Sequence, residues 1–315
     1  MAKICVVGSI NMDIVTSVDT YPERGQTVFG KKIMEFPGGK GANQSIACAR
    51  QNKAVTLIGC VGQDVHGNSL INDLQKNHVD TSNIKRLADS SSGQTTIILD
   101  DEAENTIIYV EGANGELDPD YVAETIHRLE DCKILLTQME TPYKTVLKAM
   151  KTAKEKGIKV ILDPAPANKV TDEMLAYADL VLPNIHETEE LTGIRVKDEQ
   201  SAREAADMFR AKGVNQGVLK LGAAGSYIFD SNELSFVEGI NVQAIDTVGA
   251  GDCFAGALAS ALIDGLRLPE AASYANVVAA LKVTKHGAQA GIPKMDEIIA
   301  FTEENNFLNY LQPNK

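Results

Sequence analysis

The chain has 315 residues, 44% of them hydrophobic, which suits one large α/β domain with a smaller accessory piece. Its formal net charge is −13 and no basic patch stands out, which argues against nucleic acid and anionic membranes as partners. The five cysteines form no CxxC pair and no cluster with histidine, so neither a zinc site nor a disulfide framework is expected.

The expected cellular location rests on targeting segments that the sequence lacks. The chain begins with a strand-like segment and not with the charged and apolar regions of a signal peptide. No apolar run approaches the ~20 residues needed to span a bilayer. We therefore expect a cytoplasmic protein whose cysteines are buried and reduced.

The first strand is expected over residues 3–8 (KICVVG), which read as a buried strand ending at a glycine. The next residues predict a loop that carries Asn11 and Asp13 two positions apart. If this loop is extended, both side chains share one face, and the carboxylate of Asp13 can accept bonds from two neighbouring hydroxyls. A turn stabilised by the Asp13 side chain is the alternative.

A small β-sheet is predicted from segments that interrupt the helical alternation of the chain. Short β-like pieces, including residues 26–29, are separated by turn residues between positions 14 and 36, and residues 94–110 resemble a hairpin. Together, 14–36 and 94–110 predict an inserted lid that excludes water and is stabilised by a second subunit. An ordinary β-excursion is the alternative.

The motif PGGKGAN at residues 37–43 opens an apolar helix over residues 44–50. Its glycines let backbone amides approach a ligand, and Asn43 can donate to and accept from hydroxyl groups. The motif is not a Walker loop, because no Gly-Lys-Ser/Thr occurs, and it lacks the third glycine of a dinucleotide-binding turn. A flexible turn with a helix cap is the alternative.

From residue 55 onward, apolar strand-like segments alternate with helical ones. This rhythm predicts a mostly parallel sheet covered on both faces, and ligands of such sheets bind beyond the carboxyl ends of the strands. Polar clusters follow four of the predicted strands: Asn11 with Asp13, Glu140, Asn184 with Glu187, and the turn from Gly222 to Gly225.

The later clusters each have a second possible role. Glu140 is either an acceptor-site carboxylate or a solvated loop residue. Asn184 and Glu187 either hold Mg²⁺ through water or form a helix cap, whose spacing they match. The glycine turn at 222–225 suits either a nucleotide or a plain hairpin, and Asn276, in a predicted helix, faces either an adenine or solvent.

The motif DTVGAGD at residues 246–252 precedes an Ala-rich helix expected over residues 254–263. A glycine turn that opens a helix directs unpaired N–H groups and the positive end of the helix dipole toward a ligand. This anion hole beside the carboxylate of Asp252 suggests phosphoryl transfer to a hydroxyl, with Asp252 as the base. A helix cap is the alternative role of Asp252.

Three motifs together resemble the PfkB family of carbohydrate kinases: GSINMD at 8–13, PGGKGANQ at 37–44 and DTVGAGD at 246–252. They occur in the order and at the separations usual in that family, over nearly the whole chain. The resemblance implies a three-layer α/β/α domain over residues 1–315, with a β-lid that joins two subunits into a homodimer. It also implies an ATP-dependent kinase for the 5-hydroxyl of D-ribose.

The same resemblance assigns roles to individual residues. Phosphoryl transfer is assigned to the base Asp252 and to the amides of Gly249, Ala250 and Gly251. The sugar is assigned to Asn11, Asp13, Gly39, Lys40, Asn43, Glu140 and Asp252. ATP is assigned to Asn184, Lys220, Gly222, Gly225, Gly251 and Asn276, and Mg²⁺, indirectly, to Glu187. A potassium ion is assigned to Asp246, Val248, Lys282, Lys285, Gly287 and Gly291.

Three positions depart from the family pattern. Lys220 stands where relatives usually have a small hydroxyl residue, and its amine could reach a phosphate. Gly291 stands where some relatives offer a serine oxygen to the potassium ion, which implies a weaker site or one completed by water. Gln26 replaces a more usual glutamate in the lid segment, without an evident consequence.

Two other functions are compatible with the sequence. A kinase of the same fold could act on fructose or on a nucleoside such as adenosine, although a nucleoside favours more apolar and aromatic groups than the polar acceptor set provides. A non-catalytic sugar- or nucleotide-binding protein is expected to lack the base, which is present here as Asp252.

Overall fold

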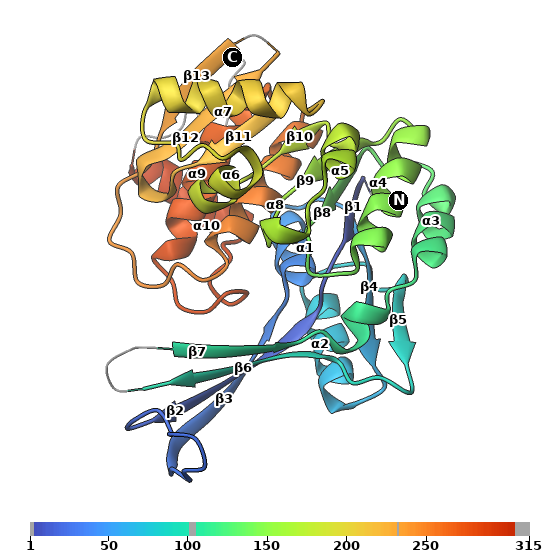
Figure 1. Ribbon diagram of the computed structural model, residues 1–315, viewed down its shortest axis with the longest axis vertical. Coiled ribbons are helices and arrows are strands. Elements are labelled where there is room, and N and C mark those ends of the chain that lie inside the picture. The colour runs from blue at the N-terminus through green and yellow to red at the C-terminus, as the bar shows by residue number, and fades with distance from the viewer. Residues whose placement is uncertain (1–2, 101–104, 232, 306–315) are drawn as a thin grey trace.

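The computed structural model describes residues 3–100, 105–231 and 233–305, and the strands in these ranges form two separate sheets. A nine-stranded sheet lies within the helical body of the molecule, and a four-stranded sheet extends away from it (Figure 1). The predicted combination of a large α/β body with a small β-sheet is confirmed.

The large sheet has the strand order β13-β12-β11-β10-β9-β8-β1-β4-β5. Neighbouring strands from β11 to β5 pair in parallel, whereas β12 and β13 run antiparallel at one edge. The strands are β1 (Ile4–Val7), β4 (Val55–Gly62), β5 (Ile84–Leu87), β8 (Ile134–Thr137), β9 (Lys159–Leu162), β10 (Leu180–Val181), β11 (Gln216–Lys220), β12 (Gly225–Asp230) and β13 (Glu233–Glu238). The carboxyl ends of the parallel strands therefore meet along one edge, where ligands bind in such sheets.

Helices cover both faces of the large sheet, because successive strand residues point to opposite sides. Ile4 and Val6 pack into a core shared with α1, α2, α8, α9 and α10, whereas Cys5 and Val7 pack into a second core shared with α3, α4, α5 and α7. The helices are α1 (Lys40–Arg50), α2 (Val65–Lys76), α3 (Pro119–Arg128), α4 (Tyr143–Glu155), α5 (Asp172–Tyr177), α6 (Ile185–Thr192), α7 (Glu199–Ala211), α8 (Ala250–Ile263), α9 (Leu268–Val283) and α10 (Met295–Glu304). The predicted three-layer α/β/α sandwich is confirmed.

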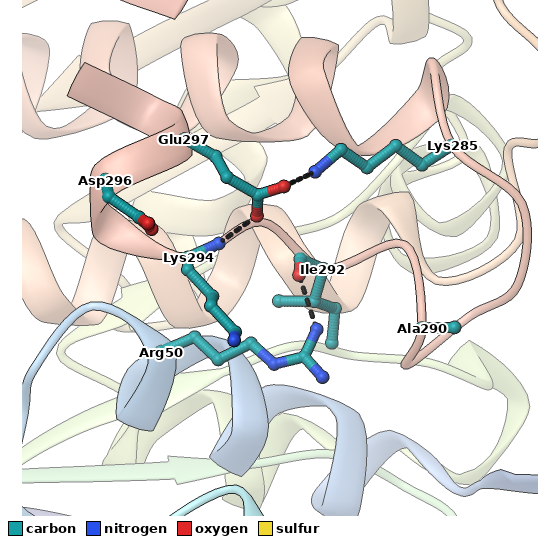
Figure 2. A pocket seen from close by; sticks show the side chains of 7 residues that line it. All are labelled: Arg50, Lys285, Ala290, Ile292, Lys294, Asp296 and Glu297. Atoms are coloured by element: carbon teal, nitrogen blue, oxygen red, sulfur yellow. Dashed lines mark hydrogen bonds and ion pairs between the residues drawn. The ribbon is translucent and has the colours of Figure 1, made fainter. Parts of the chain in front are cut away.

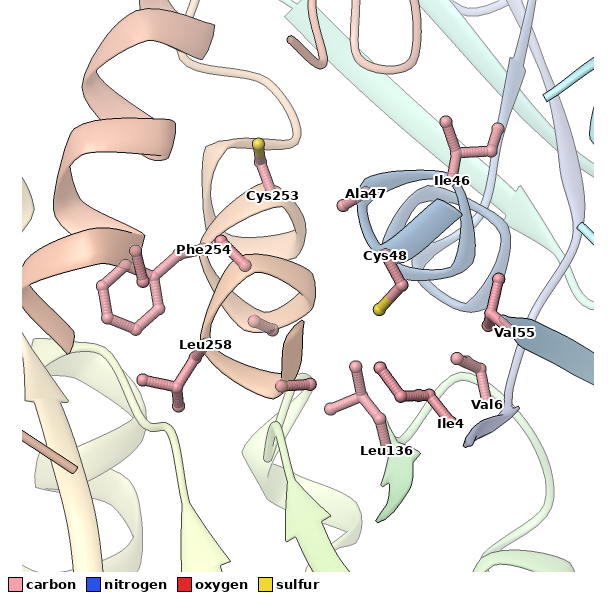
Figure 3. Packing of buried hydrophobic residues seen from close by; sticks show 14 of the residues in the cluster. Ile4, Val6, Ile46, Ala47, Cys48, Val55, Leu136, Cys253, Phe254 and Leu258 are labelled. Atoms are coloured by element: carbon pink, nitrogen blue, oxygen red, sulfur yellow. The ribbon is translucent and has the colours of Figure 1, made fainter. Parts of the chain in front are cut away.

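The contact between α1 and α8 places the functional motifs side by side, since each helix begins at one of the glycine-rich segments. Figure 3 shows Ala47 and Cys48 of α1 beside α8 within the first core, and the thiol of Cys48 donates to the carbonyl of Gly256 in α8 at 3.5 Å. A Cβ atom on Gly256 would lie 2.5 Å from the Cβ of Ala47 and 2.9 Å from the carbonyl oxygen of Gln44. Glycine at 256 therefore allows the two helices to approach closely.

The small sheet has the order β3-β2-β6-β7 and consists of β2 (Asn11–Val18), β3 (Gly30–Gly38), β6 (Gly93–Leu99) and β7 (Asn105–Val110). β2 pairs antiparallel with β3 and parallel with β6, and β6 and β7 form the predicted antiparallel hairpin. Residues 101–104 of the predicted lid lie outside the described residues.

Two local predictions about this sheet are wrong. Asn11 and Asp13, predicted in a loop, belong to β2, because their backbone pairs with both β3 and β6. Residues 26–29, predicted as a strand, form none, since no described strand pairs with them. Gln26 instead closes a turn in which its amide donates to the carbonyl of Glu23 at 2.9 Å.

All five cysteines are free and buried. Burial raises the pKa of each thiol, which keeps the side chains protonated and unreactive in the core. In the described parts of the chain, no helix combines the length and apolarity that crossing a membrane requires.

Candidate active site

A cavity of about 490 Å³ lies at the carboxyl edge of the large sheet. Residues following three parallel strands line it, namely Asp163 after β9, Asn184 after β10 and Lys220 at the end of β11. The first turn of α8 and residues of α9 complete the wall. The cavity is lined by all six residues predicted to bind ATP: Asn184, Lys220, Gly222, Gly225, Gly251 and Asn276.

Asp252 is the third residue of α8, and it is 6% exposed. Its carboxylate accepts hydrogen bonds from the side-chain amides of Asn43 at 2.8 Å and Gln44 at 3.2 Å. The N-cap of the helix is Gly249, in the left-handed region at a φ of 76°, and no side chain caps this helix. The alternative role of Asp252 as a helix cap is therefore wrong.

The charge of Asp252 is balanced by a lysine across the cavity. Burial raises the pKa of Asp252, and the ammonium of Lys40 acts in the opposite direction. The carboxylate in turn raises the pKa of Lys40. A buried carboxylate with a raised pKa is a stronger proton acceptor than a solvated one, as a general base requires.

Two of the three amides predicted to form the anion hole are available to a ligand. The amide of Ala250 donates to the carbonyl of Thr247 at 3.1 Å. Among the residues that the structure describes, none accepts a hydrogen bond from the amide of Gly249 or Gly251. The open end of the helix dipole adds positive potential at the same place, which favours a phosphoryl group there.

Apart from Asp252 in α8, the residues predicted to bind the sugar come from β2, the start of α1 and the segment after β8. Asn11 and Asp13 share one face of β2, and Lys40 and Asn43 lie in the first turn of α1. Glu140 accepts a hydrogen bond from the backbone amide of Lys40 at 3.2 Å, and the ammonium of Lys40 lies 3.9 Å from its other carboxylate oxygen. Glu140 is thus held against α1 and is not a solvated loop residue.

Close backbone packing holds the β2 residues in place. A Cβ atom on Gly39, whose φ is 90°, would lie 2.8 Å from the backbone nitrogen of Asn11, so α1 begins directly against β2. The side-chain oxygen of Asn11 accepts a hydrogen bond at 2.7 Å from Asn114, a buried residue that the motifs do not include. Burial also raises the pKa of Asp13.

Asn184 and Glu187 form a capping box at the start of α6, which confirms their predicted alternative role. The side-chain oxygen of Asn184 accepts from the amide of Glu187 at 2.9 Å, and the carboxylate of Glu187 accepts from both amide groups of Asn184 at 2.7 Å. Both residues still line the cavity, and burial raises the pKa of Glu187. Asn276 also lines it, and its amide donates to the carbonyl of Glu238 at 3.3 Å.

Two buried residues that the sequence analysis did not assign, Gln44 and Asp163, connect the predicted base Asp252 with Lys220, which is predicted to bind ATP. The side-chain amide of Gln44 lies 2.9 Å from Asp163 and 3.2 Å from Asp252. Asp163 in turn forms a 2.8 Å ion pair with Lys220, whose ammonium lies near Gly251, a residue of the predicted anion hole. We call the sequence Lys220–Asp163–Gln44–Asp252 the polar chain.

The buried ion pair of the polar chain should contribute strongly to stability. The side chains of Lys220 and Asp163 are 14% and 3% exposed. We expect Lys220→Met to lower the free energy of unfolding by about 3 kcal/mol, because it leaves the Asp163 carboxylate buried and unpaired. Adding Asp163→Asn should recover much of the loss. Urea denaturation measures both changes.

A solvent-exposed ion pair provides the control. Lys151 and Glu173 lie 2.6 Å apart with side chains 35% and 56% exposed, so Lys151→Met should change stability by less than about 1 kcal/mol. Equal losses for the Lys151 and Lys220 variants would contradict the interpretation.

The residues assigned to a potassium ion gather around Asp246. Its carboxylate accepts hydrogen bonds from the amides of Val248 at 2.9 Å and Gly287 at 2.7 Å. Burial alone would raise the pKa of Asp246, but these two donors hold it below its ordinary value. Lys282 is fully buried, and its ammonium donates to the carbonyl of Asp246 at 2.9 Å. Burial lowers the pKa of Lys282, while the Asp246 carboxylate opposes that shift.

A second cavity, of about 310 Å³, lies beside the loop that follows α9 (Figure 2). The guanidinium of Arg50 donates to the carbonyls of Gln289 and Ile292, and the ammonium of Lys285 pairs with Glu297. These contacts attach the loop between α9 and α10 to α1 and α10. The side chain of Lys285 is thus engaged at this second cavity, and only its backbone remains for the predicted cation site.

The position of the buried carboxylate defines the class of the protein. An aspartate in the first turn of a helix whose free amides face a cavity is the arrangement of a kinase that phosphorylates a hydroxyl group. The chain belongs to the pfkB family of carbohydrate kinases, which it matches over residues 1–295.

Individual relatives are similar over nearly the whole chain. The ribokinase of Haemophilus influenzae is 38% identical over 300 residues, which cover 95% of this chain and 98% of that protein. The crystal structure of ribokinase from Thermotoga maritima is 35% identical, with a TM-score of 0.88, covering 96% of this chain and 100% of its own. The structure of Arabidopsis thaliana ribokinase complexed with ribose and ATP is 29% identical, with a TM-score of 0.90, covering 96% of this chain and 99% of its own.

Proposed function

We propose that this chain transfers the γ-phosphoryl group of ATP to the 5-hydroxyl of D-ribose, giving D-ribose 5-phosphate and ADP. The observation that carries the proposal is the buried carboxylate of Asp252, held by Asn43 and Gln44 beside the cavity. The named ribokinases, one of them complexed with ribose and ATP, support the choice of donor and acceptor.

In the proposed complex, ATP occupies the 490 Å³ cavity and the sugar lies against β2 and the start of α1. The triphosphate approaches the open amides of α8, and the adenosine lies between the glycine turn 222–225 and α9. The carboxylates of Asp13 and Glu140 accept bonds from ribose hydroxyls, while Lys40 and Asn43 supply donors. This mixture of donors and acceptors suits a polyhydroxylated sugar better than an apolar acceptor.

Phosphoryl transfer follows from this placement. The 5-hydroxyl oxygen forms a bond to the γ-phosphorus as the bond to the bridging oxygen of ADP breaks. An aspartate cannot ionise an alcohol in advance, because an ordinary carboxyl pKa is about 4, so Asp252 takes the proton late in the reaction. The amides of Gly249 and Gly251 hold the phosphoryl oxygens, and positioning supplies much of the rate.

Mg²⁺ is part of the proposal, and the residues of the cavity fit it as an ion held through water. The carboxylate of Glu187 lines the cavity, and its oxygens retain lone pairs for coordinated water beyond their bonds to Asn184. When bound, Mg²⁺ neutralises negative charge on the phosphates. The proposal also includes a monovalent positive charge behind the anion hole, near Asp246.

Release of ADP from ATP, measured with D-ribose, D-fructose and adenosine in turn, tests the proposed acceptor. We expect turnover with ribose to exceed that with the other two. Turnover with fructose or adenosine alone would retain the kinase mechanism and reject ribose. Ribose binding without any turnover would instead favour a non-catalytic binding protein.

The rate should fall at acid pH, because the proposed base acts only when it is ionised. The pKa of Asp252 is raised, so the acid limb of kcat/KM should have its midpoint above the ordinary value of 3.8. Lys40→Met removes the charge that most opposes this shift, so the midpoint should move to higher pH as well as the rate falling. A midpoint that is identical in both proteins would contradict the assigned role of Lys40.

We extend the proposal to a cytoplasmic homodimer joined through the small sheet. Large apolar side chains of this sheet and its adjoining turn are exposed, including Phe29 at 93%, Ile33 at 65% and Ile107 at 57%. Exposed apolar patches of this kind mark interaction surfaces. A second copy of the chain would cover the patch and bury its apolar side chains.

A further inference from the structure

The family resemblance assigns a potassium ion to the neighbourhood of Asp246, but a lysine side chain of this chain extends into that neighbourhood. Potassium is held by oxygen atoms, often backbone carbonyls. The carbonyl oxygen of Asp246 instead accepts a hydrogen bond from the ammonium of Lys282 at 2.9 Å. An oxygen atom of Asp246, one of the residues assigned to the ion, is thus already bonded to a cation of the chain itself.

Lys282 lies in the last turn of α9, where the helix dipole favours a positive charge. It is the second-last residue of α9, at the negative end of the helix dipole, and its side chain is 0% exposed. The amides of Ile245 and Asp246 donate to the carbonyl of Val283 at 2.7 and 3.1 Å, so the end of α9 is tied to the segment before α8. A buried ammonium is costly unless polar groups compensate for its lost hydration, and the carbonyl and the carboxylate of Asp246 contribute to that compensation.

Gly291 makes room for this lysine. A Cβ atom on Gly291 would lie 3.2 Å from the Cε atom of Lys282 and 2.7 Å from the carbonyl oxygen of Gly287. A serine at this position, as in some relatives, would therefore have to displace the Gly287 carbonyl as well as shift the end of the lysine side chain. Glycine at position 291 and the buried lysine at position 282 therefore lie next to each other and fit together sterically.

The ammonium of Lys282 contacts the segment that leads from Asp246 into the predicted anion hole at Gly249. A Cβ atom on Gly249 would lie 3.3 Å from Ala288, so the loop after α9 packs against the turn that opens α8. A potassium ion here would lie close to the Lys282 ammonium. Repulsion between two unit charges about 4 Å apart near a protein surface weakens binding on the order of a thousandfold.

We infer that the side-chain ammonium of Lys282 replaces the monovalent cation of the family, so that this chain supplies the positive charge behind its anion hole from its own sequence. Ammonium and potassium carry the same charge and have similar sizes, which makes the substitution chemically reasonable. The inference rests on the proposed kinase function for its effect on rate, but not for its statement about cation binding. The chain should accordingly be active without potassium.

The first test measures ribose phosphorylation with sodium, potassium or tetramethylammonium as the only monovalent cation. We expect the wild-type rate to change less than about twofold among them, since the charge is built in. A rate at least tenfold higher in potassium would overturn the inference and leave the proposed function intact. No turnover in any of the three salts would reject the proposed function, and the cation-binding test below would then decide the inference.

Removing the Lys282 ammonium should create a binding site for a potassium ion near Asp246. Lys282→Ala with Gly291→Ser removes the ammonium and adds an oxygen ligand, so its rate should fall about tenfold or more in sodium and recover in potassium. Lys282→Met fills the space without charge, so its lower rate should not recover. Lys294→Ala is the matched control, because this exposed lysine follows the same loop and should leave the cation response unchanged.

Anomalous scattering from crystals soaked in rubidium tests cation binding without activity. We expect no rubidium peak within ~4 Å of the Asp246 carbonyl in the wild type, because the ammonium repels a second cation. A peak should appear there in the Lys282→Ala, Gly291→Ser double variant. A wild-type peak at that carbonyl would overturn the inference, and this arm needs no variant to fold.

Discussion

Replacing Asp252 with asparagine reduces kcat for ribose phosphorylation by about a thousandfold, because loss of a general base typically costs 10²–10⁴ in rate. The amide that replaces the carboxylate cannot take up the proton of the 5-hydroxyl as the bond to phosphorus forms. The backbone of α8 and its open amides are unchanged, so ATP should still bind. Steady-state ADP release and nucleotide binding, measured on the same preparation, separate the two effects.

A matched control lies at the other end of the same helix. Asp264 follows the last residue of α8 and pairs with Lys53 at 2.7 Å on the surface. Asp264→Asn should retain nearly all of the wild-type rate. If Asp252→Asn kept more than about a tenth of that rate, the carboxylate would be a binding group and not the base.

Replacing Asp13 with alanine lowers kcat/KM for D-ribose by about a thousandfold, because two hydrogen bonds to a charged group are lost, each worth about 1.5–3 kcal/mol. The carboxylate lies beside Asn11 on one face of β2, where two neighbouring hydroxyls of the sugar could bond to it. Competition between ribose and 2-deoxyribose provides the sharper measurement. The wild type should prefer ribose, and the variant should lose most of that preference.

The control for Asp13 is an acidic residue just beyond the same strand. Asp19 follows β2 and pairs with Lys31 at 2.6 Å, with its side chain 74% exposed. Asp19→Ala should leave both kinetic constants close to those of the wild type. An Asp13→Ala enzyme that still discriminates against 2-deoxyribose would show that another residue recognises the hydroxyl.

The parts of the site that could be predicted from the sequence are those formed by residues that are neighbours in the chain. The glycine turn before α8 and the motif before α1 could be located because glycine, aspartate and helix periodicity are adjacent in the chain. The alternating βα pattern likewise predicted the parallel sheet and the edge where polar residues gather. These features depend on a few neighbouring residues, which is the range over which sequence patterns are informative.

The remaining parts depend on contacts between distant segments. Gln44 directly follows a motif and Asp163 directly follows a strand, so both carried a positional signal, but their roles appear only when α1, β9 and α8 meet. The strand state of Asn11 and Asp13 depends on pairing with β3 and β6, which local propensity does not encode. The role of Lys282 likewise required the fold, because its partner Asp246 is 36 residues away along the chain.

The strand β2 carries Asn11 and Asp13, which we propose bind the sugar, at its start and continues between β3 and β6. Side chains alternate between the faces of a strand, so inserting or deleting one residue before Asp13 would turn its carboxylate to the opposite face. We therefore expect natural relatives to carry no insertions or deletions in the early part of β2. Residues 22–28 lie between β2 and β3, belong to neither and precede the proposed interface residue Phe29, so natural insertions, or a reporter peptide added by an engineer, are best accommodated there.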